Sequence, residues 1–401
     1  MHVLIIPSWY PTPDDPLQGP FFREQAHALK NAGLRVGVIA PQLESFRNLL
    51  HSWKHLKRSV WGWPPGERCW DDDGVSTWLR YGWSFPLRVL CGMEDSWLKV
   101  GRSLFDRYVS KHGMPDVVHA HCAILAGFLA ARIKQRHGIP YVLTEHNSSY
   151  ARDGFQPRHF PMIETALARA DARVFVSRHL GETVESKFGE LARPWIRIPN
   201  VIDTRLFSPD LLPVKESGAA RLLFVGSLIE VKGISYLLDA LAQLRRQRSD
   251  WHLDVVGNGS ERAKHERSVK ELGLSDAVVF HGRKSRQEVS QWMRRCDLFV
   301  LPSLEETFSV VTAEALATGT PVLATRCGGP EEIITEESGM LVPPRDASAL
   351  AAALGTMIDR LPDYDRAAMA RRVNEEYGHD TVTRMIRNVY SQVTSTEGAQ
   401  G

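Results

Sequence analysis

Two glutamates separated by seven residues, Glu306 and Glu314, stand where an apolar strand over Leu298–Leu301 gives way to a helix over Val310–Ala317. In α/β proteins, this junction between strand and helix is where ligands bind. Backbone N–H groups at a helix N-terminus lack intrahelical partners, so those at Thr307 to Val310 can hold a phosphate or sugar hydroxyls. A carboxylate accepts paired hydroxyls well, so one glutamate suits a ribose and the other a hexose. Helix capping would account for Glu306 but not for a second glutamate directed into the same cleft.

Three histidines also follow or lie within apolar strands. His146 comes directly after a strand over Tyr141–Thr144, and we expect it to face a cleft from the first half of the chain. His119 and His121 belong to the end of a strand over Asp116–Ala120, and we expect one of them to face the core and the other the cleft. A His-x-His pair can ligate zinc, but the sequence offers no third cluster of ligands. We therefore interpret the pair as structural or acceptor-side residues and expect no metal site.

These residues are positioned by a regular alternation of short apolar runs with longer amphipathic stretches. Continuous hydrophobicity in the short runs indicates strands buried on both faces, as in a parallel sheet covered by helices. Two successive units of this kind predict an α/β protein with two Rossmann-like domains that face each other across a cleft. The expected strands are Val3–Ile6, Arg35–Ala40, Asp116–Ala120, Tyr141–Thr144, Ala172–Val176, Ile196–Pro199, Arg221–Val225, His252–Val256, Val278–His281, Leu298–Leu301 and Pro321–Ala324. The expected helices are Phe22–Ala32, Leu125–His137, Ser235–Gln247, Arg286–Arg295, Val310–Ala317, Ala347–Arg360 and Asp380–Val393.

The domain boundary is expected in the Pro- and Gly-containing stretch that follows the first set of strands. We predict a first domain over residues 1–200, a second over 201–380, and a final helix over 381–401 that packs back on the first domain. A tryptophan-rich insertion near residues 44–97 interrupts the alternation in the first domain.

The composition excludes other classes of protein. With 401 residues, of which 43% are hydrophobic and 24% charged, the chain is long enough for two cores and is not disordered. A formal charge of +2 without a long basic run predicts no nucleic-acid partner. The five cysteines are scattered and form no C-x-x-C pair, which disfavours a disulfide framework and favours a reducing compartment. The chain starts on a strand rather than a signal peptide, and its longest apolar stretches are about half what a membrane-spanning helix needs, so we expect a cytoplasmic protein, soluble or peripheral.

The tryptophan-rich insertion begins with a positively charged segment. Seven of the eleven tryptophans lie within residues 53–97, and apolar residues recur at helical spacing in segment 46–63, which contains no acidic residue. A basic amphipathic helix with an aromatic edge suits a membrane surface that carries anionic lipid. A helix packed over the first domain, with ordinary core tryptophans, has the same periodicity, so both interpretations stay open. The basic residues of the segment are Arg47, Lys54, Lys57 and Arg58.

The glutamate pair and its surroundings resemble one family of enzymes. The segment from Glu306 to Glu314 is similar to the E-x7-E motif of retaining glycosyltransferases with the GT-B fold, specifically family 4, the glycosyl transferases group 1. The similarity extends over nearly the whole chain and is strongest from Leu222 to Leu354. Further matching segments are Gly19–Phe22, His119–His121, Thr144–His146, Pro199–Asp203, Phe224–Ser227, Lys232–Gly233, Val256–Gly259, Cys327–Ile333 and Gly339–Pro344.

The resemblance implies a role for each of the chemical residues. Glu314 would bind the ribose of a sugar nucleotide, and Glu306 would contact the transferred sugar. Lys232 would neutralise the diphosphate, which gains charge as the glycosidic bond breaks. The family pairs this lysine with an arginine about five residues earlier, where this chain has Ser227. Ser227 could donate a hydrogen bond in its place, or Arg283 could approach from another loop.

The resemblance also implies roles in the first domain. His146 would touch the donor sugar near the reacting carbon, and Gly19 would let backbone N–H groups approach the phosphate or the acceptor closely. No metal or other cofactor is implied, since the nucleoside-diphosphate sugar is a substrate. The expected catalytic residues are thus His146, Glu306 and Lys232. The expected donor-binding residues are Gly19, Ser227, Lys232, Glu306, Thr307, Phe308, Ser309, Val310 and Glu314.

The implied reaction is transfer of a sugar from a nucleoside diphosphate to an acceptor hydroxyl, with retention of the anomeric configuration. The acceptor would be a glycan or a lipid-linked molecule in cell-surface polysaccharide or glycolipid synthesis, reached at the inner face of the membrane. Residues 1–200 would serve the acceptor and residues 201–380 the nucleotide sugar. No carboxylate pair at glycosidase-like positions can be argued, so a covalent double displacement is not supported. A front-face route, in which the leaving phosphate helps to deprotonate the acceptor, is favoured for the similar enzymes.

Three other functions are compatible with parts of the sequence. A sugar-nucleotide epimerase of this fold usually lacks the E-x7-E pattern. A non-catalytic nucleotide-binding scaffold is compatible with Ser227, but the retention of Lys232 and both glutamates disfavours it. A dehydrogenase is disfavoured because the first strand is not followed by G-x-G-x-x-G.

Overall fold

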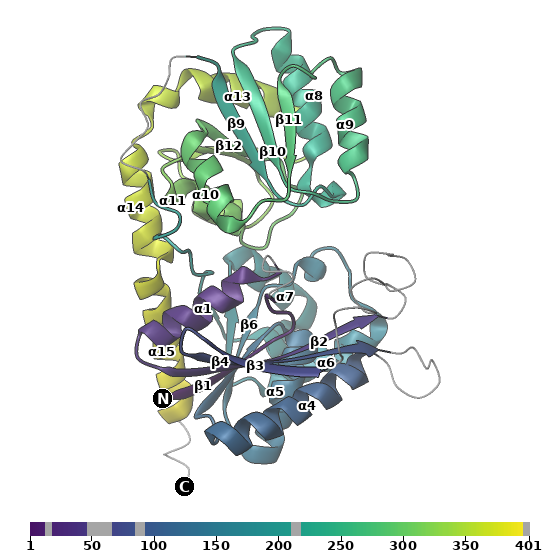
Figure 1. Ribbon diagram of the computed structural model, residues 1–401, viewed down its shortest axis with the longest axis vertical. Coiled ribbons are helices and arrows are strands. Elements are labelled where there is room, and N and C mark those ends of the chain that lie inside the picture. The colour runs from purple at the N-terminus through teal and green to yellow at the C-terminus, as the bar shows by residue number, and fades with distance from the viewer. Residues whose placement is uncertain (13–17, 46–65, 85–92, 210–217, 396–401) are drawn as a thin grey trace. The chain divides into compact units, whose positions relative to one another are not determined.

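The computed structural model describes residues 1–12, 18–45, 66–84, 93–209 and 218–395 (Figure 1). The chain divides into two compact units, each built on a mainly parallel sheet with helices packed against it. The first unit comprises Met1–Val176, Gly181–Ile198 and Thr383–Gly401, and the second comprises Ser177–Leu180 and Pro199–Val382. The predicted α/β architecture with two Rossmann-like sheets is therefore confirmed.

The first unit contains an eight-stranded sheet in the order β3-β4-β2-β1-β5-β6-β7-β8. All neighbouring strands are parallel except the hairpin of β3 and β4 at one edge. Every residue of β1 is buried, as its continuous apolar run predicts. The strands are β1 (His2–Pro7), β2 (Arg35–Ser45), β3 (Gly66–Asp72), β4 (Val75–Ser84), β5 (Val117–His121), β6 (Tyr141–Glu145), β7 (Ala172–Phe175) and β8 (Trp195–Arg197). The main helices are α1 (Pro20–Asn31), α4 (Met93–His112), α5 (Phe128–His137), α6 (Phe160–Arg169) and α7 (Arg178–Phe188).

One helix of the first unit begins later than predicted. The expected helix over Leu125–His137 starts at Phe128, because residues 123–127 form an irregular turn in which Leu125 has φ 63°. Ser8, directly after β1, donates its hydroxyl to the carbonyl of Ile124 at 2.8 Å and so ties this turn to the sheet. Local periodicity alone could not reveal this turn, since its apolar residues continue the helical pattern.

The tryptophan-rich stretch contains elements that the periodicity did not predict, namely β3, β4 and α4. Trp78 and Trp97 are buried, and the indole of Trp97 donates to the carbonyl of Pro41 at 3.1 Å. These two tryptophans are therefore core residues of the first unit. The predicted basic helix over residues 46–63 lies outside the described residues. Among the helices of the described ranges, none has the length and apolar character needed to cross a bilayer.

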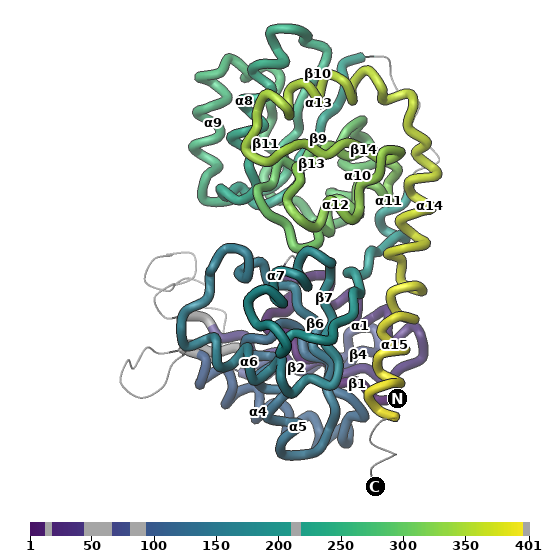
Figure 2. The backbone as a smooth tube through the Cα atoms, turned by 180° about the vertical axis from the view of Figure 1, so that it is seen from behind, coloured from purple at the N-terminus to yellow at the C-terminus, as the bar shows by residue number. Residues whose placement is uncertain are grey.

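The second unit has six parallel strands in the order β11-β10-β9-β12-β13-β14. Counted from β9, this is the 3-2-1-4-5-6 order of dinucleotide-binding Rossmann domains. Helices α8, α9 and α13 pack together, and α10, α11 and α14 pack together (Figures 1 and 2). The strands are β9 (Ala220–Val225), β10 (Trp251–Val256), β11 (Val278–Gly282), β12 (Leu298–Leu301), β13 (Val322–Thr325) and β14 (Gly339–Val342). The helices are α8 (Ile234–Arg245), α9 (Arg262–Glu271), α10 (Arg286–Arg295), α11 (Val310–Ala317), α12 (Pro330–Ile333), α13 (Ala347–Asp359) and α14 (Arg366–Tyr377).

The last helix, α15 (His379–Ser395), contributes most of its length to the first unit. Its buried Tyr390 bonds through the hydroxyl to Nδ1 of His119 at 2.6 Å, and Nε2 of His119 bonds to the hydroxyl of Thr144 at 2.7 Å. Burial lowers the pKa of His119 to about 3, so this imidazole is neutral at physiological pH. The helix is thus held to the sheet by a buried polar contact as well as by its apolar face.

Replacing Tyr390 with phenylalanine should destabilise the first unit by about 1–2 kcal/mol, because the buried ring of His119 loses a hydrogen-bond partner. Hydrogen exchange should show faster exchange of the α15 amides, and denaturant unfolding should give the loss in stability. Tyr364→Phe is a matched control, since the buried hydroxyl of Tyr364 has no partner in the described part of the chain. Equal effects of the two substitutions would contradict this account of α15.

Candidate active site

The predicted donor-binding residues of the second unit gather at one point of its sheet. The sheet order reverses between β9 and β12, which are direct neighbours. The loop after β9 carries Ser227 and Lys232, and the loop after β12 carries Glu306 and leads into α11. In open α/β sheets, ligands bind at the carboxyl ends of the strands that flank such a switch point.

The loop before α11 presents unpaired backbone donors. Among the described residues, the N–H groups of Thr307, Phe308, Ser309 and Val310 have no hydrogen-bond partner. Ser309, at the N-cap, has φ 73°, a left-handed conformation that costs a non-glycine residue about 1–3 kcal/mol and is concentrated at functional sites. The side chain of Phe308 is buried against Tyr377, so this residue can serve a ligand only through its backbone. The helix N-terminus is therefore built to receive an anion or hydroxyl groups.

Lys232 and Glu306, 74 residues apart in sequence, form an ion pair at this point. The ammonium of Lys232 lies 2.6 Å from Oε1 of Glu306, which also accepts from the hydroxyl of Ser303 at 2.8 Å. The backbone of Glu306 is fixed on both sides, since its N–H donates to the carbonyl of Cys327 and its carbonyl accepts from the N–H of Gly329, each at 2.8 Å. The structure thus brings together the predicted cation and the predicted sugar contact, and it holds both in place.

A close backbone approach orders the loop that carries Lys232. Gly233 follows it with φ 68°, and a Cβ at this position would lie 1.9 Å from the carbonyl oxygen of Pro302. Only glycine can occupy the position, which explains the Lys-Gly pair of the sequence. Ser227 is exposed in the same loop, and Arg283 follows β11, which is separated from β9 by β10. Which of them supplies the missing second donor stays a prediction.

Glu314 lies in the second turn of α11 and is almost completely buried, with 3% of its surface exposed. Burial raises the pKa of its carboxyl group, and the guanidinium of Arg286 acts in the opposite direction. The distance from Nη1 of Arg286 to Oε1 of Glu314 is 2.8 Å. This contact was not predicted from the sequence, where nothing links Arg286 at the start of α10 with the glutamate motif.

The segment Cys327–Ile333 lies next to Glu306 and is itself held by side-chain hydrogen bonds. Glu331 accepts from the N–H of Gly328 at 3.1 Å. Glu332 accepts from the N–H of Arg178 at 2.5 Å and from that of His179 at 3.2 Å. Glu331 therefore orders the turn beside Gly329, which bonds to Glu306, whereas Glu332 holds the residues at the start of α7 that belong to the second unit.

The remaining two predicted residues, His146 and Gly19, belong to the first unit and form a separate cluster there. Nε2 of His146 bonds to Nδ1 of His121 at 3.0 Å, and its ring packs against Phe21 and Phe22. Gly19 has φ 67° and caps α1, and a Cβ there would lie 2.7 Å from the ring of Trp9. The expected roles of His146 and Gly19 toward a donor stay predictions.

The expectation that His119 and His121 point to opposite sides is wrong. Their rings stack at a centroid distance of 4.3 Å, and both are buried, because alternate residues of a strand share a face. Burial, followed by the neighbouring His119 and His146, lowers the pKa of His121 well below its usual value. The pair is therefore neutral and belongs to the core beneath His146.

Glu145 was not predicted as a site residue and appeared only within the matching segment Thr144–His146, yet it organises the loop that carries His146. Its carboxylate accepts from the N–H groups of Ala123, His146 and Asn147 and from the hydroxyl of Tyr150, at 2.8–2.9 Å. A buried carboxylate with four donors fixes a backbone firmly. A sequence signal for it does exist, because an acidic residue at the end of an apolar strand needs such donors.

The described ranges bring one group of possible metal ligands together, His27, Asp72 and Asp73. Asp72 is already held by Arg23, whose Nε and Nη2 lie 2.6 and 2.5 Å from its two oxygens. This bidentate ion pair, aided by His27, holds the pKa of Asp72 well below its usual range. The cluster fits an ion pair that joins α1 to the β3–β4 hairpin.

The chain has two doubly wound domains, and the switch point of the second carries an anion-binding helix N-terminus and a glutamate pair. This combination is typical of a GT-B glycosyltransferase. The chain matches the family described as Glycosyl transferases group 1 over residues 213–376 and the Glycosyl transferase 4-like domain over residues 18–201. It is 30% identical over 323 residues to the D-inositol 3-phosphate glycosyltransferase of Xylanimonas cellulosilytica, covering 72% of this chain and 74% of that protein.

Solved structures agree with this classification of the fold. The sucrose-phosphate synthase of Thermosynechococcus elongatus superposes with a TM-score of 0.75 and 21% identity, over 99% of this chain and 100% of that one. Anabaena Alr3699/HepE in complex with UDP-glucose superposes with a TM-score of 0.70 and 17% identity, over 98% and 100%. The chain belongs to the group 1 glycosyltransferases and is a glycosyltransferase of GT-B fold, which confirms the predicted family.

Proposed function

We propose that the protein transfers a sugar from a nucleoside-diphosphate sugar to an acceptor hydroxyl, with retention of configuration at the anomeric carbon. The observation that carries this proposal is the loop before α11. Its four unpaired N–H groups lie at the switch point that Lys232 and Glu306 also occupy. Such a site suits a diphosphate joined to a sugar, because donors, a cation and a hydroxyl acceptor converge on it. The UDP-glucose complex of the similar Anabaena protein supports this class of donor.

In this proposal, each residue has a distinct task. Glu314 accepts the ribose hydroxyls, and the N–H groups at Thr307 to Val310 receive the diphosphate or the sugar. Lys232 exchanges its ion pair with Glu306 for the diphosphate and stabilises the charge that develops on the leaving phosphate. Glu306 then turns to the hydroxyls of the transferred sugar. The cation is thus kept in place by the carboxylate before the donor arrives.

Retention is proposed to follow a front-face route in which the leaving phosphate accepts the proton of the acceptor hydroxyl. The bond from the anomeric carbon to the diphosphate breaks while the bond to the acceptor oxygen forms on the same face. Charge stabilisation is assigned to Lys232 and the helix N-terminus, so no bound metal is invoked. His146 is proposed to contact the donor sugar.

A panel of nucleotide sugars tests the proposal. The purified protein, incubated with UDP-, GDP-, ADP- and dTDP-sugars, should slowly hydrolyse one of them and release its nucleoside diphosphate. Transfer to an added acceptor should preserve the anomeric configuration, as seen by NMR of the product. Binding without any turnover would favour a non-catalytic scaffold, and conversion of the nucleotide sugar into an isomer would favour an epimerase.

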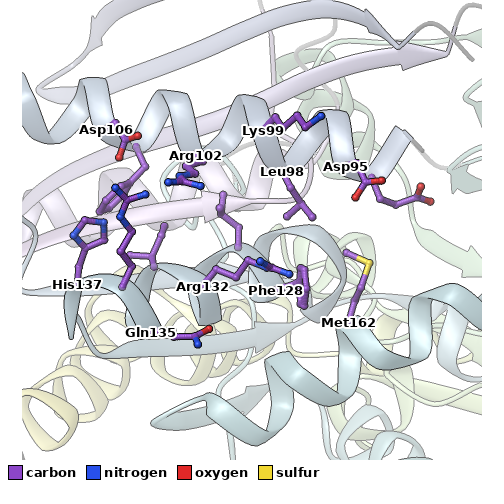
Figure 3. Close-up of a pocket in the computed structure, with 15 residues that line it drawn as sticks. Asp95, Leu98, Lys99, Arg102, Asp106, Phe128, Arg132, Gln135, His137 and Met162 are labelled. Atoms are coloured by element: carbon purple, nitrogen blue, oxygen red, sulfur yellow. The ribbon is translucent and has the colours of Figure 1, made fainter. Parts of the chain in front are cut away.

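The acceptor is proposed to be a lipid-linked molecule or a growing glycan, in polysaccharide or glycolipid synthesis at the inner face of the membrane. A groove of about 590 Å³ in the first unit supports an amphiphilic partner (Figure 3). It runs between α4 and α5, which lie side by side, with Met162 of α6 at its wall. Its apolar lining includes Leu98, Phe128 and Ile133, and its basic residues are Lys99, Arg102, Arg132 and Arg136. Its carboxylates, Glu94, Asp95 and Asp106, lie toward the ends of this stretch of α4.

Vesicle flotation should reveal the membrane contact. The wild-type protein is expected to float with vesicles containing phosphatidylglycerol, and changing Lys54, Lys57 and Arg58 to glutamate should weaken binding about 100-fold, at about 1 kcal/mol for each cation. The double variant R102E/R132E should also bind more weakly. The matched control changes the three cations Lys264, Arg267 and Lys270 of α9 to glutamate and should bind normally. Unchanged flotation of the first two variants would remove the membrane from the proposal.

A further inference from the structure

Glu314 is almost completely buried, although its proposed role requires an ionised carboxylate. A carboxylate with 3% of its surface exposed is strongly disfavoured as an ion unless it is paired. Yet it must be ionised to accept hydrogen bonds from two ribose hydroxyls at once, since a protonated carboxyl group has lost acceptor capacity. Its neighbours along α11, Ala313 and Ala315, are buried and apolar and supply no charge. The charge must therefore be balanced from another element.

Arg286 supplies that balance from the first position of α10. Its Nη1 lies 2.8 Å from Oε1 of Glu314. Within the described part of the chain, Glu314 forms an ion pair with Arg286 alone. The backbone of Arg286 is fixed by a capping box, in which Ser285 and Glu288 exchange hydrogen bonds across the start of the helix. The approach of the guanidinium to α11 is thus determined by where α10 begins.

An aromatic ring also lies against the guanidinium. The ring of Phe207 lies 5.0 Å from the centre of the guanidinium, and Phe207 is fully buried. The segment that carries Phe207 is anchored on the same helix, because Ser290 and Arg294 both donate to the carbonyl of Leu206 at 2.6 Å. Arg286 thus contacts both a buried ring and a buried carboxylate, which preorganises both charges.

We propose that Arg286 is a positioning residue of the donor site, which keeps Glu314 ionised and oriented for the ribose hydroxyls, with Phe207 as its support. The inference rests on the proposed role of Glu314 in binding the ribose. If the inference is right, replacing Arg286 weakens nucleotide binding even though Arg286 lies outside the glutamate motif and does not contact the reacting atoms.

The pH dependence gives this role a specific signature. The charged groups that act on Glu314 are Arg286 of α10, which lowers its pKa, and Asp203, after β8, which raises it together with burial. Removing Arg286 leaves only the contributions that raise the pKa, so the carboxyl group becomes protonated at higher pH than in the wild type. Nucleotide affinity of such a variant should be lowest in acid and should recover as the pH rises and the carboxyl group ionises.

The test compares R286M, R286K, E314Q and R295M with the wild type. Arg295, an exposed arginine in the last turn of α10, serves as the control. The probe is whichever of UDP, GDP and ADP binds the wild type, titrated by calorimetry between pH 6 and 9, and donor KM and kcat are measured alongside. R286M should weaken binding about 10- to 100-fold near pH 7, because losing the neighbouring positive charge raises the pKa of the carboxyl group and leaves it mostly protonated there, and binding should recover toward pH 9. R286K, which retains the charge, should show a smaller loss and the pH profile of the wild type, and R295M should change nothing.

The outcomes separate this inference from the function on which it rests. Loss of binding in E314Q with normal binding in R286M would overturn the role of Arg286 alone. Normal binding in both variants would overturn the ribose site itself. A pH-independent loss in R286M without rescue in R286K would also contradict the positioning role, as would an effect on kcat with unchanged KM. If R286M does not fold, R286K tests the positioning role by itself. Its pH profile must then match that of the wild type, and a different profile would overturn the role.

Discussion

Replacing Lys232 with alanine should lower kcat by roughly 100- to 1,000-fold, the effect typical of removing one donor that stabilises developing negative charge. The ammonium lies 2.6 Å from Glu306 at the switch point and is the cation that the proposed mechanism turns toward the leaving diphosphate. Affinity for the nucleoside diphosphate should fall as well, since the product carries the same charge. Steady-state kinetics with the preferred donor and calorimetric titration of the product measure the two effects.

The loss in K232A should not come from unfolding. The side chain of Lys232 is 23% exposed, and the fold of its loop depends on the close approach of Gly233 to Pro302 rather than on the ammonium. Lys270→Ala, on the exposed face of α9, is the matched control and should retain full activity. Wild-type turnover in K232A would remove Lys232 from the mechanism and would favour Arg283, after β11, as the cation.

Replacing Glu306 with glutamine should lower kcat/KM by about 10- to 100-fold, because one charged hydrogen bond to the transferred sugar becomes a neutral one. The expected pattern differs from that of K232A. Affinity for the bare nucleoside diphosphate should be unchanged or improved, since Lys232 no longer has to leave a carboxylate before it binds phosphate. Comparing titrations of the nucleoside diphosphate and of the intact nucleotide sugar measures this difference directly.

Glu271→Gln, at the exposed end of α9, is the control for this substitution and should leave turnover unchanged. In E306Q, Ser303 should keep the glutamine side chain in place, as its hydroxyl can still donate to the amide oxygen at the position of Oε1. A fall in nucleoside-diphosphate affinity in E306Q equal to that in K232A would contradict the assignment of Glu306 to the sugar.

Much of the fold could be predicted because it is encoded locally. Strands such as β12 and helices such as α10 and α11 were predicted with their observed bounds, since continuous apolar runs and helical spacing depend on neighbouring residues. The β3–β4 hairpin was missed although the sequence indicates it, since Asp73-Gly74 is a typical hairpin turn and β4 is rich in aromatic and β-branched residues. The start of α5 was placed too early because the turn before it is apolar throughout.

The sequence by itself determined the order of the elements, the family, and the residue types of the site, because motifs such as E-x7-E and Lys-Gly record local geometry at strand ends. Only the tertiary structure decided which of these residues meet. Lys232 reaches Glu306 because β9 and β12 are neighbours at the switch point, and Arg286 reaches Glu314 because α10 packs on α11. Likewise, His119 bonds to Tyr390 of the last helix although the two residues are far apart in sequence, and it stacks on His121. Strand order and helix packing arise from burial of the whole chain, and no window of neighbouring residues contains them.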